Sequence, residues 1–344
     1  MTSLGEAHET PELLGEISVP SGALVLVDAG LLGVWGGSRD DLPETVDLRV
    51  DGPDADEAGR RFKRSWHPRY WYDIPREKLD DARSQFASFV SSEGLTAELA
   101  VVPGAVPHRR RIDLALEHGG GRFGVLEFFG IQAPVVAGLP RGRELPVHGF
   151  RMREDEFSDR WRWVTAEVNE GDTARTEEIG IVFVDEARLM FADANALQSW
   201  KHDEPLDGKA DYVFWGRDAA AAAARHGAPQ LASSEYGWMD LPLEDAAERG
   251  LAVEGTRDRE GWTFAGDFRP HSHHHEVLRQ MRESETGAGV IEVGGARVCA
   301  FFTSWGDGAF PVLADLGADE KLLRLRVDLG GDETVRRLRQ VLGK

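Results

Sequence analysis

Four histidines fall within five residues of the chain, and such a cluster can coordinate a divalent ion because neutral imidazole is a common metal ligand. They are His271, His273, His274 and His275. Pro270 and an apolar periodicity that includes Val277 predict a helix that begins near Ser272. Consecutive helical residues point about 100° apart, so only His271 with His274 or His275 could converge on one ion, completed by a carboxylate from elsewhere. We favour the structural alternative, a helix entry with His274 on the apolar side and its neighbours in water.

The same segment begins like the zinc-protease helix H-E-x-x-H, in which two histidines one turn apart bind the metal and the glutamate acts as a base. His275 and Glu276 supply the first two positions. Arg279 stands where the second histidine belongs, and a cation cannot replace a metal ligand. The motif is therefore incomplete.

A cationic run follows Pro107, which predicts that Arg109, Arg110 and Arg111 occupy the first turn of a helix. The helix dipole disfavours cations at this end, so other groups should compensate their charge. We favour ion pairs with Asp or Glu from the other half of the chain. The functional alternative is a pocket for a small anion or a phosphate, in which the three arginines act together with His108.

A further candidate is the loop Trp305-Gly306-Asp307-Gly308, which lies between two predicted strands. The two glycines allow positive φ on both sides of Asp307, so its carboxylate either bonds to loop amides or points outward. As chemistry, Asp307 could be a base or a metal ligand. As structure, which we favour, it forms an Asx-type turn. A binding surface at this loop would consist of Trp305, Gly306, Asp307, Gly308 and Phe310.

Two other motifs point away from catalysis. Residues 119–124 read G-G-G-R-F-G and match the dinucleotide-binding fingerprint, but a helix is predicted before the motif and a strand after it. That order is the reverse of the one that sets a pyrophosphate on a helix N-terminus, so we reject a Rossmann site. Cys299 lies between Val298 and Ala300 with no activating base nearby in sequence, which predicts a buried, inert thiol.

The elements that must position these residues are predicted mainly as antiparallel strands. Apolar residues recur every three or four positions from Pro75 to Gly94 and predict an amphipathic helix. Gly294-Gly295 predicts a tight hairpin between residues 290–293 and 297–303. Residues 309–316 and the alternating residues 323–329 extend it to a C-terminal β-meander, covered by a final helix from near Asp332. The predicted fold class is α+β, with mainly antiparallel sheets and helices packed on one face.

A chain of 344 residues predicts about two domains. Residues 1–16 carry four glutamates and no Lys or Arg, which predicts a flexible acidic tail. A Pro and Gly cluster between Pro134 and Pro146 marks a boundary. We therefore predict an N-terminal α+β domain over residues 17–140 and a C-terminal α+β domain over residues 141–344, which carries the Asp307 loop.

The segment from Ser304 to Val312, with Asp315 and the closing strand through Asp328, resembles the signature of a bacterial family named domain of unknown function 4241. Upstream, Ser21-Gly22 with Asp28 is similar to that family's opening turn and strand. The likeness is strongest over the last fifty residues or so. Family members usually carry a small polar residue and a tyrosine before the proline, where this chain has Ala309 and Phe310. The resemblance implies a fold and no assigned activity.

Composition excludes several classes of protein. Forty Lys and Arg against 60 Asp and Glu give a net charge of -20, which repels nucleic acids and anionic lipid. No apolar run is long enough for a membrane span, and the first residues lack the cations of a signal or transit peptide. The single cysteine indicates a reducing compartment. We expect a soluble, cytoplasmic protein.

The function predicted from these observations is a non-catalytic binding module for a protein partner or a small ligand, without a cofactor. The charge favours a partner with a basic surface, as in an acidic immunity-like protein that neutralises a toxin. The alternative is a metal-dependent hydrolase that uses His271, His274 or His275 with Asp307 and a divalent ion such as zinc or manganese.

Overall fold

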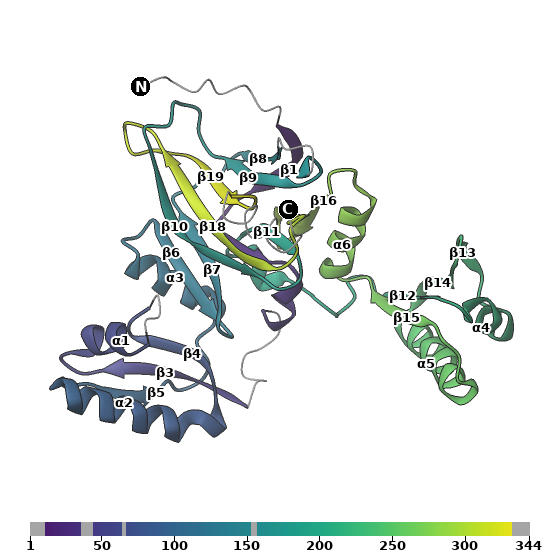
Figure 1. Cartoon of the computed structure of the whole chain (residues 1–344), viewed down its shortest axis with the longest axis horizontal. Helices are drawn as coiled ribbons and strands as arrows, with labels where there is room; N and C mark the ends of the chain where they lie inside the picture. The colour runs from purple at the N-terminus through teal and green to yellow at the C-terminus, as the bar shows by residue number, and fades with distance from the viewer. Residues whose placement is uncertain (1–10, 36–43, 64–66, 153–156, 332–344) are drawn as a thin grey trace, which may run out of the picture. The chain divides into compact units, whose positions relative to one another are not determined.

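The computed structural model describes residues 11–35, 44–63, 67–152 and 157–331, and the chain divides into two compact units (Figure 1). The larger unit comprises Met1–Ser199 and Met281–Lys344, and the inserted unit is Trp200–Gln280. This division differs from the predicted boundary at residue 140. The Pro and Gly cluster there connects β7 (Ile131–Ala137) to β8 (Glu144–Arg151), two strands of the larger unit that lie in different sheets of one core.

Two six-stranded antiparallel sheets build the larger unit. The first has the order β1 (Glu12–Ser18), β8, β9 (Trp161–Glu167), β19 (Leu322–Asp328), β18 (Gly308–Leu316), β10 (Arg175–Val184). The second has the order β16 (Ala288–Val293), β17 (Ala296–Phe302), β11 (Arg188–Asp193), β2 (Ala23–Asp28), β7, β6 (Phe123–Phe128). One hydrophobic cluster takes side chains from both sheets, among them Trp161, Phe191 and Phe301, so the sheets pack face to face.

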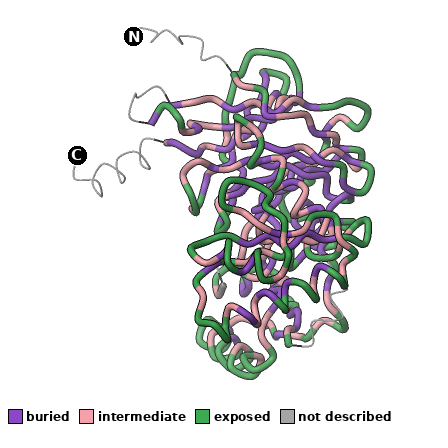
Figure 2. Tube along the Cα trace, turned by 90° about the vertical axis from the view of Figure 1, so that its right-hand side faces the viewer, coloured by how far each residue is buried: buried purple, intermediate pink, exposed green. Residues whose placement is uncertain are grey.

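Three helices pack against sheets of this unit. The helix α3 (His108–His118) packs on β6, where Gly124 permits close approach because a Cβ there would lie 2.5 Å from the backbone of Ala115. A smaller sheet with the order β4 (Tyr70–Pro75), β3 (Thr45–Asp51), β5 (Glu98–Val101) packs against α1 (Ala55–Lys63) and α2 (Leu79–Glu93). Figure 2 shows the buried and exposed stretches of the chain, and many exposed positions lie in connections and on the outer faces of helices such as α2.

The inserted unit is built on a four-stranded antiparallel sheet. Its order is β13 (Gln230–Ala232), β14 (Glu235–Pro242), β12 (Lys209–Trp215), β15 (Ala265–Pro270). Tyr212 and Phe214 on one face of β12 pack against α4 (Ala219–His226) and α5 (Leu243–Glu260). The helix α6 (His273–Glu283) begins in this unit. None of the helices within the described ranges is both long and apolar enough to cross a membrane.

The α+β class with mainly antiparallel sheets is confirmed. The predicted helix between Pro75 and Gly94 is α2, and Gly94 ends it with a φ of 66°. The predicted hairpin is β16 and β17, joined by Gly294 and Gly295 at φ of 54° and 80°. The helix predicted from Asp332 lies outside the described residues. Gly119–Gly124 follows α3 and includes the first two residues of β6, in the helix-then-strand order that excluded a Rossmann site.

Two predictions about strands were wrong. The C-terminal strands do not form one meander, because β17 pairs with β11 in one sheet whereas β18 pairs with β10 in the other. The predicted tail over residues 1–16 includes residues of β1, which pairs with β8 from Glu12 onward. Glu12 forms an ion pair with Arg151, and Glu16 forms one with Arg297, so the like charges that predicted disorder are compensated.

Candidate binding pocket

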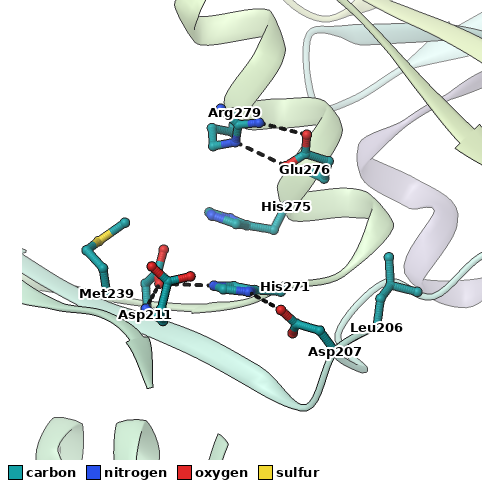
Figure 3. A pocket seen from close by; sticks show the side chains of 9 residues that line it. Leu206, Asp207, Asp211, Met239, His271, His275, Glu276 and Arg279 are labelled. Carbon is teal, nitrogen blue, oxygen red and sulfur yellow. Dashed lines mark hydrogen bonds and ion pairs between the residues drawn. The ribbon is translucent and has the colours of Figure 1, made fainter. Parts of the chain in front are cut away.

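The inserted unit contains a cavity of about 410 Å³ on the face of the sheet opposite α5 (Figure 3). Successive residues of a strand point to opposite faces, so Tyr212 faces the helices while Asp211 faces this cavity. The lining residues come from the loop before β12, from β12 and β14, and from the segment around the start of α6. They are Leu206, Asp207, Asp211, Met239, Asp240, His271, His275, Glu276 and Arg279.

A β-bulge in β14 places two of these residues. Ala210 pairs with Leu241 and Tyr212 pairs with Trp238, so Met239 and Asp240 together stand opposite the single residue Asp211. Asp240 has a φ of 55°, in the left-handed region that aspartate tolerates better than most residues. Its backbone N–H donates to Oδ1 of Asp211 at 2.8 Å, and this bond fixes the bulge.

His271 connects the loop before β12 to the floor of the cavity (Figure 3). Its Nδ1 lies 2.9 Å from Oδ2 of Asp207, and its Nε2 lies 3.0 Å from Oδ1 of Asp211. Ionised carboxylates only accept hydrogen bonds, so both ring nitrogens donate and the ring is an imidazolium cation. Burial lowers the pKa of His271, but the hydrogen bonds to Asp211 and Asp207 outweigh it and hold the pKa above its usual range.

The second histidine of the cavity has the opposite character. Burial is the main cause that lowers the pKa of His275, and the positive charge of Arg269 lowers it further. At neutral pH its ring is therefore uncharged and offers one donor and one acceptor. Neither ring nitrogen of His275 makes a hydrogen bond with a residue that the structure describes. In Figure 3 the ring lies above that of His271 and points into the cavity.

Glu276 and Arg279 form an ion pair on α6 with N to O distances of 3.0 and 2.7 Å. That hydrogen bond lowers the pKa of Glu276. Arg279 thus stays a cation at the position where a zinc-protease helix would hold its second histidine. Among the described residues, no group of three or more His, Cys, Asp or Glu side chains is arranged to hold a metal ion.

The remaining members of the histidine cluster stabilise the fold. His273, rather than the expected His274, is the buried member, because it lies on the same helix face as the buried residues Val277 and Met281. Its ring stacks on Trp200, and its Nδ1 accepts a hydrogen bond from the backbone N–H of Lys201 at 2.9 Å. The ring of His274 stacks on His202 with 3.9 Å between centroids. Only His271 and His275 line the cavity.

The predicted cationic run at the start of α3 is compensated within its own half of the chain, not by the other half. Arg111 is fully buried and donates to both Asp47 and Asp73. Arg110 pairs with Glu117.

The other two members of that run are also engaged. Arg109 pairs with Asp113 one turn further along α3. The His108 ring is buried and stacks on Trp35 with 4.6 Å between centroids.

The Asp307 loop belongs to the larger unit and connects β17 to β18. Oδ1 of Asp307 accepts a hydrogen bond from the backbone N–H of Ala187 at 3.0 Å. The carboxylate therefore connects its loop to the turn between β10 and β11, instead of bonding to amides of its own loop. Gly306 has a φ of 79°, whereas Gly308 does not take the positive φ that was expected. The reason is that Gly308 is the first residue of β18 and pairs with Val184 of β10, while Ser304 at the start of the loop is left-handed with a φ of 63°.

The aromatic residues near this loop pack against the core. The Nε1–H of Trp305 donates to the carbonyl of Trp161 at 2.6 Å. Phe310 is buried in the core between the two large sheets. The Asp307 loop and the cavity at His271 lie in different compact units.

Sequence reasoning found the histidines of the cavity but missed the groups that hold them. Asp211 interrupts the apolar run of β12, and a lone carboxylate among buried residues is a signal that could have identified it. Met239 and Asp240 carry no comparable signal, because they reach the cavity through a β-bulge that the sequence does not show.

Comparisons of the chain with protein-family models, with curated proteins and with solved structures gave no match. The resemblance to domain of unknown function 4241 therefore stays a prediction.

Proposed function

We propose that the protein is a non-catalytic binding module and that the cavity of the inserted unit accepts a basic side chain of a protein partner. The observation that carries this proposal is the charge of the lining. Four carboxylates face one arginine and one imidazolium, so the cavity has an excess of negative charge.

One carboxylate of the lining is available to a ligand. Asp207 and Asp211 bind His271, and Glu276 binds Arg279. The side chain of Asp240, by contrast, makes no hydrogen bond or ion pair with a residue in the described part of the chain. A lysine or arginine head group would pair with Asp240, and the neutral ring of His275 would accept a second hydrogen bond from it.

The rim of the cavity suits the stem of such a side chain. Leu206 and Met239 line the cavity and are 52% and 46% exposed. Long cationic side chains lay their methylene groups along apolar surface while the charged end reaches a polar site. The net charge of -20 would also attract a basic partner over distance and increase its rate of association.

The hydrolase alternative receives less support from the geometry. Both ring nitrogens of His271 are already engaged by carboxylates, and His274 stacks on His202 outside the cavity lining. An ion at His271 would have to displace a proton that two aspartates stabilise.

The proposal is tested by NMR titration of the protein with N-acetyl-arginine amide and with N-acetyl-citrulline amide, a neutral compound of similar shape. We expect saturable shifts of the Asp240 and His275 signals with the arginine compound alone. A charge-assisted hydrogen bond contributes roughly 1.5–3 kcal/mol, so Asp240→Asn should weaken binding about tenfold to a hundredfold. Asparagine also tolerates the left-handed conformation, so the fold should be retained.

The matched control is Asp245→Asn, which removes an exposed charge from α5 without touching the cavity. It should leave binding within about twofold of the parent, because an exposed charge is screened by solvent. Equal binding of the arginine and citrulline compounds, or unchanged binding in Asp240→Asn, would refute the proposal.

A further inference from the structure

A second cavity of about 240 Å³ lies on the other face of the same sheet, between α5 and β15. It is lined by Tyr212, Ala247, Gly250, Leu251, Glu254 and Phe268. Two large apolar side chains at this groove are open to solvent, since Leu251 is 71% exposed and Phe268 is 41% exposed. Neighbouring exposed apolar side chains of this size mark interaction surfaces more often than single ones do.

Two glycines let the backbone pack closely against the ring of Tyr212. A Cβ at Gly250 would lie 2.9 Å from the ring, and a Cβ at Gly266 would lie 2.4 Å from its hydroxyl oxygen. The helix and the strand therefore approach the ring closely, and Tyr212 is buried beneath them with its hydroxyl 3.4 Å from Oε1 of Glu254. The groove over it is mainly apolar, and its exposed walls are Leu251 and Phe268.

The strand beside the groove is the end of its sheet. β15 pairs with β12 along one edge, and no strand in the described residues pairs with its other edge. Such an edge presents backbone N–H and C=O groups that can hydrogen-bond to an added strand. Alternation along β15 directs Gly266 and Phe268 to the groove face, while Asp267 and Arg269 point to the opposite face.

We propose that this edge and groove bind an extended segment of the partner protein, which adds to β15 as a further strand. The segment carries an apolar side chain that fills the groove, and basic side chains alternate with it. Every second side chain of the added strand would face the opposite side of the sheet. That side carries the acidic cavity with Asp207, Asp211 and Asp240, so basic residues suit those positions.

Charge also selects this occupant over others. Residues 200–280 contain 15 Asp and Glu against nine Lys and Arg, so the inserted unit disfavours an acidic segment and a second copy of itself. On α5, Glu248 and Glu254 stand one turn before and after Leu251 and add negative charge to the groove side. The basic character of the segment rests on the proposed function, whereas its strand geometry does not.

The test uses the full-length protein and a fluorescently labelled synthetic peptide, acetyl-Lys-Val-Lys-Phe-Lys-Val-Lys-amide. Binding is measured by fluorescence anisotropy, and amide hydrogen exchange is measured over residues 265–270. We expect saturable binding, with exchange at β15 slowed at least tenfold. Control peptides replace the central phenylalanine with serine, or all lysines with glutamate, and both should bind at least tenfold more weakly.

Protein variants locate the contact. Phe268→Ser should weaken peptide binding at least tenfold, and Leu251→Glu should behave in the same way, because both side chains are exposed walls of the groove. Leu231→Ser is the matched control, since Leu231 is 39% exposed on β13 of the same sheet. It should leave binding unchanged.

Several outcomes would overturn the inference. One is peptide binding without protection of the β15 amides, and another is equal binding by the glutamate peptide. A dimer of the protein alone that Phe268→Ser dissociates would identify a second copy as the occupant. The arginine amide titration at Asp240 distinguishes the two proposals, because it reports on the acidic cavity and does not depend on β15.

Discussion

Replacing Arg111 with methionine tests whether the cationic run of α3 is structural. The guanidinium is fully buried and donates to both oxygens of Asp47 and of Asp73 at distances of 2.7–3.1 Å. Its Nε donates to the carbonyl of Val106 at 3.0 Å, and it lies 4.1 Å from the ring centre of Tyr72. The side chains of Arg111, Asp47 and Asp73 are 0% exposed.

The expected loss follows from this burial. Methionine fills a similar volume but leaves two carboxylates without their counterion in a site that water does not reach. Removing one partner of a buried ion pair destabilises a protein by about 3–5 kcal/mol. We expect Arg111→Met to lower the free energy of unfolding by that amount. Adding Asp47→Asn and Asp73→Asn to the same protein should recover part of it, because no uncompensated charge then remains.

Urea unfolding followed by tryptophan fluorescence measures these differences. Arg110→Met is the matched control, because the ion pair of Arg110 with Glu117 is exposed and should contribute less than about 1 kcal/mol. A loss below about 1 kcal/mol in Arg111→Met would refute the structural role. If the run instead bound phosphate, millimolar phosphate would stabilise the parent protein by mass action, and we expect no such effect.

Three further predictions concern single residues. The folded-state pKa of His271 lies above the ordinary 6.5, so its pairing with Asp207 and Asp211 stabilises the fold fully below pH 6.5 and is lost as pH rises through the folded value. The stability difference between the parent and His271→Asn, measured by urea unfolding, should therefore be larger at pH 5.5 than at pH 8.5, and the reverse trend would contradict the network. Burial raises the pKa of Cys299 to about 12, so iodoacetamide at pH 8 should label it only in urea, and rapid labelling of the native protein would show that it is accessible. Gly306→Ala should destabilise the protein by about 1–2 kcal/mol in thermal or urea unfolding, because a Cβ is strained at its positive φ, and equal stability would mean that the turn is misassigned.

Local elements of the fold could be predicted because their signals are local. Gly294-Gly295 specifies a two-residue turn by its permitted φ, and a turn this short brings the strands on either side together as an antiparallel pair. The helix α2 shows its apolar face in the spacing of its residues, and Gly94 ends it. In each case the residues that determine the element lie within it.

Strand partners could not be predicted, because alternation shows which face of a strand is buried but not which strand lies beside it. β17 and β18 follow each other in sequence with a turn-like loop between them, yet they belong to facing sheets. β1 was not predicted for the same reason, because its pairing partner lies far away in the sequence. Its acidic residues predict disorder unless Arg151 and Arg297, which come from distant strands, are known to lie beside them.

One left-handed residue of the acidic cavity bears on the proposed function. Asp73, Ser304 and Asp240 take left-handed conformations, as Phe129, Ala187 and Glu320 also do, and such conformations are uncommon for residues other than glycine. The carboxylate of Asp73 binds buried Arg111, and Oγ of Ser304 accepts a hydrogen bond from the N–H of Trp161, so the fold uses both side chains.

The fold has no such use for the side chain of Asp240 among the described residues. The bulge requires the backbone N–H of that position, which glycine would supply with less strain. The proposed function gives this carboxylate a use, because a basic head group in the cavity would pair with it.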